Sequence, residues 1–135
     1  MKLSRDKELN GAMIIKMISV PLKIESLNKT LRQHWSKRAK EKKLWFDHIR
    51  AACNWKPPQA KGKMRVIVTS YRKRLLDTDN LVGGAKGLRD SMKDLGMVMD
   101  DSPKWSEWIY EQKLFSEFGV AKAKNEVTTI RLEEA

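Results

Sequence analysis

Six aspartates fall within residues 75–103 of a chain that is otherwise strongly basic. They are Asp77, Asp79, Asp90, Asp94, Asp100 and Asp101. Carboxylates placed this close together repel one another unless a positive group lies among them. A divalent cation is the simplest such group. Hard carboxylate oxygens without thiolates suit Mg²⁺, with Mn²⁺ as an alternative, rather than Zn²⁺.

The spacing of the acids predicts how they are positioned. Asp77 and Asp79 are two residues apart, so they point to the same side of an extended segment. Asn80 is the predicted N-cap of a helix that Gly96 closes, because apolar residues recur between them at steps of three and four. These apolar residues are Leu81, Ala85, Leu88, Met92 and Leu95.

Residues 97–99 are expected to form a short buried extended run that carries Asp100 and Asp101 back to the beginning of that helix. Three carboxylates would then meet at one ion, with Lys86 within reach. The alternative is that these acids only cap helices and turns on a solvated surface, which is a common use of Asp.

The same residues resemble the signature of the RusA-type Holliday-junction resolvases. The resemblance rests on Asp77-Thr78-Asp79-Asn80-Leu81, Lys86, Asp90, Leu95-Gly96 and Asp100-Asp101-Ser102-Pro103. This motif spans roughly a fifth of the chain. In the shorter members of the family the lysine follows the second Asp by four residues. Here Gly83 and Gly84 lie in a longer spacer, as in the variant associated with phage and prophage members.

Members of this family are small homodimeric Mg²⁺-dependent endonucleases that resolve four-way DNA junctions. The resemblance implies that Asp77, Asp79 and Asp101 hold the metal, with Asp100 as the alternative to Asp101. The metal would polarise the scissile phosphate and activate a water molecule. Lys86 would assist by stabilising the developing negative charge or by orienting that water.

Two further residues of the motif are expected to support the site. Asn80 is expected to position the turn before the helix. Asp90 follows Lys86 by four residues, so the two side chains are expected to pair across one helical turn.

The overall charge favours a nucleic-acid partner. The chain has 28 Lys and Arg against 17 Asp and Glu, which gives a net charge of +11. Such a field attracts polyanions, of which DNA is the commonest. A membrane surface is the competing explanation, but no apolar stretch approaches the length needed to span a bilayer. DNA contacts are expected from Asn28, Lys29, Arg32, Lys37, Arg38, Lys42, Arg72, Lys73 and Arg74.

Length and pattern predict one α+β domain with a mixed sheet packed with helices. The 135 residues are 41% hydrophobic, enough for one core. Residues 1–11 are expected to form a polar arm and residues 12–135 the domain. The predicted order is strand 13–20, loop 22–33, helix 35–53, loop 54–63, strand 64–71, helix 81–95, strand 105–115, a loop at 119–124 and strand 126–132.

The long helix is predicted to pack through one apolar face, formed by Trp35, Ala39, Phe46, Ile49 and Cys53. Its other faces are basic. Cys53 is the chain's single cysteine, so it excludes an intramolecular disulfide and is expected in the core. With no signal-peptide pattern, the expected compartment is the reducing cytoplasm of a bacterial host cell, for a host-encoded or phage-encoded protein.

Two other functions stay open from the residues. One is a basic DNA-binding module without catalysis, in which the acids are structural. The other places a nuclease site at Glu111-Gln112-Lys113 downstream of Asp101, because Asp…Glu-x-Lys is the minimal pattern of restriction-enzyme-like nucleases. Trp105 and Trp108 are expected to anchor the core or a dimer interface, or alternatively one of them stacks on an exposed base.

Overall fold

The computed structural model describes residues 14–114 and 126–135, and these form an α+β domain, as predicted. The expected arm at residues 1–11 and the expected loop at residues 119–124 lie outside the described residues. In chain order the elements are β1 (Ile14–Val20), α2 (Leu27–Arg32), α3 (Trp35–Ala52), β2 (Met64–Arg72), α4 (Thr78–Gly84), α5 (Lys86–Asp94), β3 (Ser106–Leu114) and β4 (Val127–Glu134).

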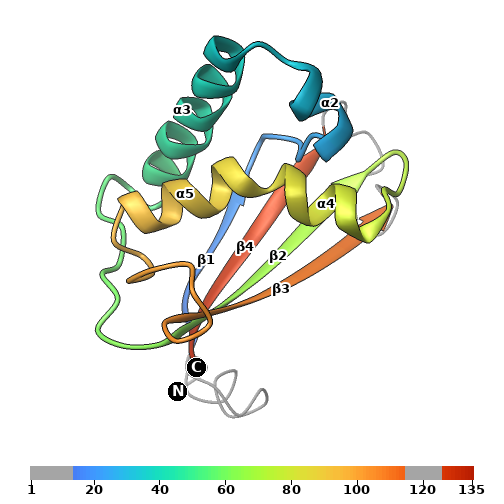
Figure 1. Ribbon diagram of the computed structural model, residues 1–135. Coiled ribbons are helices and arrows are strands. Elements are labelled where there is room, and N and C mark those ends of the chain that lie inside the picture. Colours follow the sequence, from blue (N-terminus) through green and yellow to red (C-terminus); the bar gives the residue numbers. More distant parts are fainter. Residues whose placement is uncertain (1–13, 115–125) are drawn as a thin grey trace.

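The four strands form one mixed sheet in the order β1-β4-β2-β3. β4 is antiparallel to both of its neighbours, whereas β2 and β3 run parallel. Figure 1 shows α4 and α5 running one after the other across the sheet, with α3 beyond them. β2 lies between β4 and β3 and is buried on both faces, because Ile67 and Thr69 are buried as well as Val66 and Val68.

The core lies between the sheet and the helices. Val66 and Val68 of β2 and Ile130 of β4 pack in one cluster with Leu88 and Met92 of α5. This cluster supplies most of the stabilisation, because each large apolar side chain that is fully buried contributes about 1.5–3 kcal/mol. None of the described helices is long and apolar enough to cross a membrane.

Helix α3 begins and ends within a residue of its predicted limits, but its predicted apolar face is wrong in its first half. Trp45 and Ile49 are buried, whereas Trp35 and Ala39 are exposed. The reason is that α3 packs on α5 from its middle onward, while its first turns extend past the core. The hydroxyl of Ser91 on α5 donates a hydrogen bond to the carbonyl oxygen of Lys42, near the middle of α3 (3.3 Å).

The predicted loop at residues 22–33 contains a short helix, α2. Its N-cap is Ser26, whose hydroxyl accepts a hydrogen bond from the backbone N–H of Lys29 (3.2 Å). A side-chain oxygen at this position satisfies one of the free donors of the first turn. The capping serine was therefore the sequence signal for this helix.

The predicted helix at residues 81–95 is divided in two and begins earlier than expected. α4 begins at Thr78, and its N-cap is Asp77 and not Asn80. The helix is interrupted at Ala85, and α5 begins at the next residue. Two glycines explain the position of α4. A Cβ at Gly84 would lie 1.7 Å from the carbonyl oxygen of Glu25, and a Cβ at Gly83 would lie 2.7 Å from the Leu27 side chain. The glycine pair therefore lets α4 lie directly against the segment that leads into α2.

Replacing Gly84 with Ala is expected to destabilise the domain by about 3 kcal/mol, because the new Cβ would overlap a backbone carbonyl and α4 would have to move. The matched control is Gly62→Ala, since a Cβ at Gly62 meets nothing within 4 Å. Urea denaturation of both variants measures the difference. Equal stability of the two variants would contradict the close approach of α4 to Glu25.

Cys53 caps the end of α3 and is buried in the core, as predicted. Burial raises the pKa of its thiol, because the thiolate is disfavoured away from water, while the charge of Lys16 acts in the opposite direction. The folded-state pKa is thus above the unfolded value of about 8.5. We expect the free energy of unfolding to fall as the pH rises above about 8.5, and the Cys53→Ala variant to lose this part of the pH dependence. Urea denaturation across that pH range measures it, and identical slopes for both proteins would contradict it.

Candidate functional site

Asp77 and Asp79 lie at the beginning of α4, just after the connection from the central strand β2. The chain leaves β2 at Arg72, and Leu76 is then fixed beside the end of β3. The backbone N–H of Leu76 donates to the side-chain oxygen of Gln112 (2.8 Å), and the Gln112 amide donates back to the Leu76 carbonyl (2.5 Å). This pair of hydrogen bonds holds Asp77 at the edge of the sheet where β2 and β3 end.

Neither carboxylate is used for local structure. Asp77 occupies the N-cap position of α4, but its side chain makes no capping hydrogen bond. Asp79 lies in the first turn, where the backbone dipoles favour negative charge. Both side chains are exposed, and neither has a hydrogen-bond or ion-pair partner among the described residues. The alternative in which these two acids serve as caps therefore finds no support in their contacts.

Asn80 connects two helices. Its side-chain oxygen accepts a hydrogen bond from the backbone N–H of Asn28 (3.3 Å), which ties α2 to the first turn of α4. This contact agrees with a positioning role for Asn80. The side chain of Asn28 remains exposed, as a residue expected to contact DNA requires.

Lys86 and Asp90 pair as predicted, with 3.2 Å between the ammonium nitrogen and a carboxylate oxygen. The Lys86 side chain remains largely exposed. Lys86 is the first residue of α5, so it follows Asp79 by seven residues, or about 10 Å of helical rise. Lys86 is therefore not in contact with Asp79.

Asp100 and Asp101 do not return to that side. The residues before them form bends instead of the expected extended run, although Met97 and Val98 are buried. Asp100 forms an ion pair with Lys93 in the last turn of α5 (3.4 Å). A hydrogen bond from Ser102, and then the contact with Lys93, lowers the pKa of Asp100. Asp101 is exposed and forms no ion pair with a described residue, so it is the more available carboxylate of the two.

The parallel pairing of β2 and β3 explains this separation. Met64 pairs with Ser106 at one end of the two strands, and Arg72 pairs with Leu114 at the other. Asp101 precedes the beginning of β3, whereas Asp77 follows the end of β2. The eight residue steps between these ends correspond to about 26 Å. Among the described residues no three His, Cys, Asp or Glu side chains come together as a metal site. The predicted convergence of three carboxylates is therefore wrong for the described residues of a single chain.

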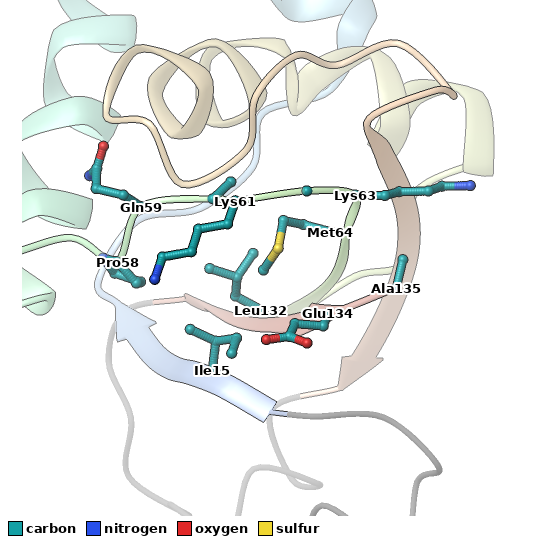
Figure 2. A pocket seen from close by; sticks show the side chains of 11 residues that line it. Ile15, Pro58, Gln59, Lys61, Lys63, Met64, Leu132, Glu134 and Ala135 are labelled. Carbon is teal, nitrogen blue, oxygen red and sulfur yellow. The ribbon is translucent and has the colours of Figure 1, made fainter.

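A cavity of about 480 Å³ lies at the end of the sheet where β2 begins. Figure 2 shows the side chains of Met64 and Leu132 together inside it, with Lys61 above them and Lys63 turned outward. This cavity is at the opposite end of β2 from Asp77 and Asp79. It contributes nothing to their surroundings.

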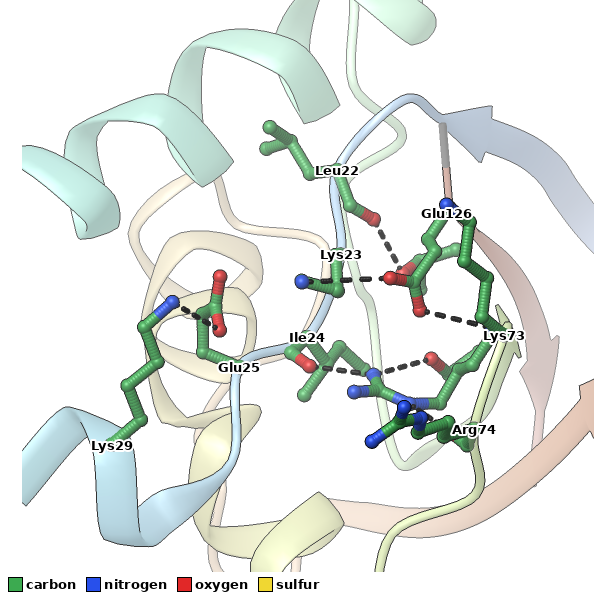
Figure 3. A network of polar contacts seen from close by, with 11 residues as sticks. Leu22, Lys23, Ile24, Glu25, Lys29, Lys73, Arg74 and Glu126 are labelled. Atoms are coloured by element: carbon green, nitrogen blue, oxygen red, sulfur yellow. Dashed lines mark hydrogen bonds and ion pairs between the residues drawn. The ribbon is translucent and has the colours of Figure 1, made fainter. Parts of the chain in front are cut away.

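One of the expected DNA contacts is corrected by the structure. Arg72 is only 5% exposed, and its guanidinium donates hydrogen bonds to the carbonyl oxygens of Ile24 (2.6 Å) and Arg74 (3.0 Å). Figure 3 shows this network joining the end of β2 to the segment after β1. Burial lowers the pKa of Arg72, and the charges of Glu126 and Glu25 oppose that shift. Arg72 therefore binds the chain's own backbone and is not available to a phosphate.

The other expected DNA-contacting side chains are all exposed. Lys29 pairs with Glu25 (3.1 Å) and Lys42 with Asp94 (3.2 Å), both at the surface. Five of these cations have no ion-pair partner among the described residues, and these are Arg32, Lys37, Arg38, Lys73 and Arg74. Residues 27–43, which span α2 and most of the first half of α3, contain seven Lys or Arg against one Glu. Residues 27–43 are called the basic arm below, and they are the most basic part of the described surface near α4.

The tryptophans and the alternative nuclease motif on β3 are also placed by the structure. Trp108 packs against the core and donates a hydrogen bond to Ser106 (2.9 Å), while Trp105 is half-buried beside Lys104. Neither is a fully exposed surface for a base.

The alternative nuclease motif on β3 begins at Glu111. Glu111 accepts a hydrogen bond from Thr69 (3.4 Å), and no metal-binding group forms around it among the described residues.

Sequence reasoning missed a groove between the basic arm and the helices α4 and α5. The groove has a volume of about 370 Å³, and Trp35 and Leu31 border it with 68% and 63% of their surface exposed. Its apolar spacing predicts Trp35 on the packed face of α3, but the structure places it at this groove. The dense charge on both sides of it, in Arg-Gln-His-Trp-Ser-Lys-Arg, was the available sign of exposure.

Comparison with known proteins adds no family to these observations: the chain matches no family model and no curated protein.

Proposed function

We propose that the protein is a metal-dependent endodeoxyribonuclease that cuts branched DNA, with the four-way junction as its substrate. The observation that carries this proposal is the pair Asp77 and Asp79. Both carboxylates are exposed and without described partners, although the chain carries a net charge of +11. Both acids lie at the beginning of α4, and exposed carboxylate oxygens are the ligands that a hard divalent cation prefers.

The basic arm supports DNA as the partner. Its exposed cations lie on α2 and α3, and Asn28 on α2 is joined to Asn80 on α4. A phosphate backbone bound along the arm would therefore pass close to Asp79. Each phosphate that the arm neutralises releases counterions, so binding should weaken steeply as salt increases.

A metal centre with three carboxylates needs a second copy of the chain. Asp101 lies at one end of β3 and Asp77 and Asp79 lie near the other end. β3 is an edge strand of the described sheet, and edge strands pair readily with a second chain. Antiparallel pairing of two β3 strands about a two-fold axis would bring the beginning of each strand to the end of its partner. Asp101 of one protomer would then approach Asp77 and Asp79 of the other.

The sequence of β3 is compatible with such self-pairing. Full overlap of the two strands is centred on Tyr110, the middle residue of Ser106–Leu114. In that register Glu107 of each protomer lies opposite Lys113 of the other, which is a favourable cross-strand pair. Ile109, which is 38% exposed, would also be covered. Two centres related by a two-fold axis match the two equivalent strands that a four-way junction presents.

A DNA-binding module without catalysis is the second candidate, because no carboxylate triad forms within the described part of one chain. The two functions are separated by incubating the protein with a synthetic four-way junction and with a linear duplex of the same sequence, in Mg²⁺ and in EDTA. Paired symmetric nicks in the junction alone, dependent on Mg²⁺, are expected. Tight binding without any cutting would favour the module.

A further inference from the structure

The groove beside the basic arm combines an apolar aromatic wall with a cationic rim. Leu31 and Trp35 form the exposed apolar part. Arg38, Lys42 and Lys86 lie along the same groove. Its volume of about 370 Å³ is within the range of sites that bind small molecules. A flat apolar group that carries negative charge on its flank fits this combination.

Trp35 is held in place by local structure and not by the core. It is the first residue of α3, and the preceding His34 is the N-cap, with its ring nitrogen accepting a hydrogen bond from the backbone N–H of Ser36 (3.3 Å). The His34 ring lies 5.4 Å from the Trp35 ring at an angle of 37°. An exposed indole fixed in this way offers a stacking surface at little entropic cost.

The opposite side of the groove is formed by glycines of α4 and α5. Gly83, Gly84 and Gly87 all border it. At Gly87 a Cβ would lie 3.3 Å from the Trp45 ring, so a larger residue would crowd this wall. These glycines let α4 and α5 pack closely against Glu25, Leu27 and Trp45, so this wall of the groove is made largely of backbone.

The charge on the groove selects among planar groups. Asp90 is paired with Lys86, and Glu41 accepts a hydrogen bond from Gln33 (3.1 Å), so both acids at the groove have partners. Arg38 has no ion-pair partner among the described residues. The charged side chains that border the groove are three cations, Arg38, Lys42 and Lys86, and two acids, Glu41 and Asp90, so their formal charges sum to +1. This excess suits the phosphate that flanks a nucleobase better than an uncharged apolar peptide.

We propose that this groove binds an unpaired nucleobase of branched DNA, stacked on Trp35 with its flanking phosphate at Arg38 and Lys86. The inference rests on the proposed action on DNA and specifies what part of the substrate is recognised. In an intact duplex the bases are paired and stacked, and their faces are not accessible. Near the exchange point of a junction a base can leave the stack at a cost of a few kcal/mol. Lys86 borders this groove and is the first residue of α5, directly after α4. A DNA strand bound in the groove would therefore continue along α4 toward Asp79.

The test measures binding in EDTA, where no cutting occurs. Fluorescence anisotropy of a labelled short oligothymidylate and of a labelled four-way junction gives the affinities of four proteins. These are the wild type, Trp35→Ala, Trp35→Phe and the control Trp55→Ala, since Trp55 is 62% exposed but lies beyond the other end of α3. Circular dichroism melts establish that each variant is folded.

Trp35→Ala is expected to weaken oligothymidylate binding by about 5-fold to 150-fold, as the loss of one base stack predicts. Trp35→Phe should retain most of the affinity, and Trp55→Ala should behave as the wild type. On the same strand made with abasic residues, the wild type and Trp35→Ala should bind equally. An equal loss on normal and abasic strands, or no loss at all, overturns the proposal.

Two further readouts separate this inference from its alternatives. If light scattering shows that Trp35→Ala changes the oligomeric state while DNA binding is unaffected, the groove is an interface between copies and the proposal fails. Cleavage of the junction in Mg²⁺ is measured on the same proteins. If binding depends on the base and on Trp35 but none of the proteins cuts the junction, the nuclease proposal fails and the stacking site stands. If the junction is cut but binding does not depend on the base at Trp35, the stacking site fails and the nuclease proposal stands.

Discussion

Replacing Asp79 with Asn is expected to abolish junction cleavage while junction binding is unchanged or improved. The amide keeps the size of the side chain but removes the charge that a divalent ion needs, and it also reduces repulsion of the DNA phosphates. Loss of one oriented group at a reacting centre typically costs about two to three decades in rate, and loss of a metal carboxylate should cost at least the upper value. Single-turnover cleavage in Mg²⁺ and anisotropy in EDTA measure the two effects separately.

The matched control is Asp94→Asn, which removes the same charge from an exposed carboxylate at the end of α5 that pairs with Lys42 (3.2 Å). Its cleavage rate is expected to stay within a few-fold of the wild type. Because both substitutions change the net charge equally, a difference between them reports on position. Normal cleavage by Asp79→Asn would remove this residue from the site and, with it, the main support for the nuclease.

Mixing two inactive variants is expected to restore cutting of one strand. Asp79→Asn and Asp101→Asn should each be inactive as homodimers. If each centre combines Asp79 of one protomer with Asp101 of the other, the mixed dimer has one centre with both substitutions and one with neither. A dimer purified through two different affinity tags should therefore nick one strand of a junction and leave the symmetric strand intact.

The reciprocal mixture is the control for this experiment. A dimer of wild type with the Asp79→Asn, Asp101→Asn double variant places one substitution in each composite centre, so it should be inactive. Centres built within single chains would give the reverse pattern, with activity in the wild-type mixture and none in the mixture of single variants. Gel analysis of the nicked strands distinguishes these outcomes without requiring any absolute rate.

The order of elements in the sequence already opposes a meeting of the two acidic pairs within one chain. A strand, a crossover helix and another strand typically form a parallel pair. In a parallel pair the end of one strand and the beginning of the next lie at opposite edges. Asp77 follows β2 and Asp101 precedes β3, so the predicted order of elements already opposed their meeting in one chain.

Other features depended on packing that periodicity does not report. Apolar spacing predicted α3 with Trp35 on its packed face, but the position of α5 leaves Trp35 exposed and buries Trp45 instead. The division between α4 and α5 follows the Gly83-Gly84 pair, whose purpose appears only with Glu25 beside it. Arg72 resembled its basic neighbours in the sequence, yet it alone turns inward to bind backbone carbonyl oxygens.

The parallel crossover between β2 and β3 has a consequence for the cell that would carry such a nuclease. A newly synthesised chain holds its two acidic pairs at a distance from each other, so under the proposed arrangement it is harmless to chromosomal DNA. Damage becomes feasible only once two folded copies have met. The topology would thus act as a safeguard that ties strand breakage to assembly.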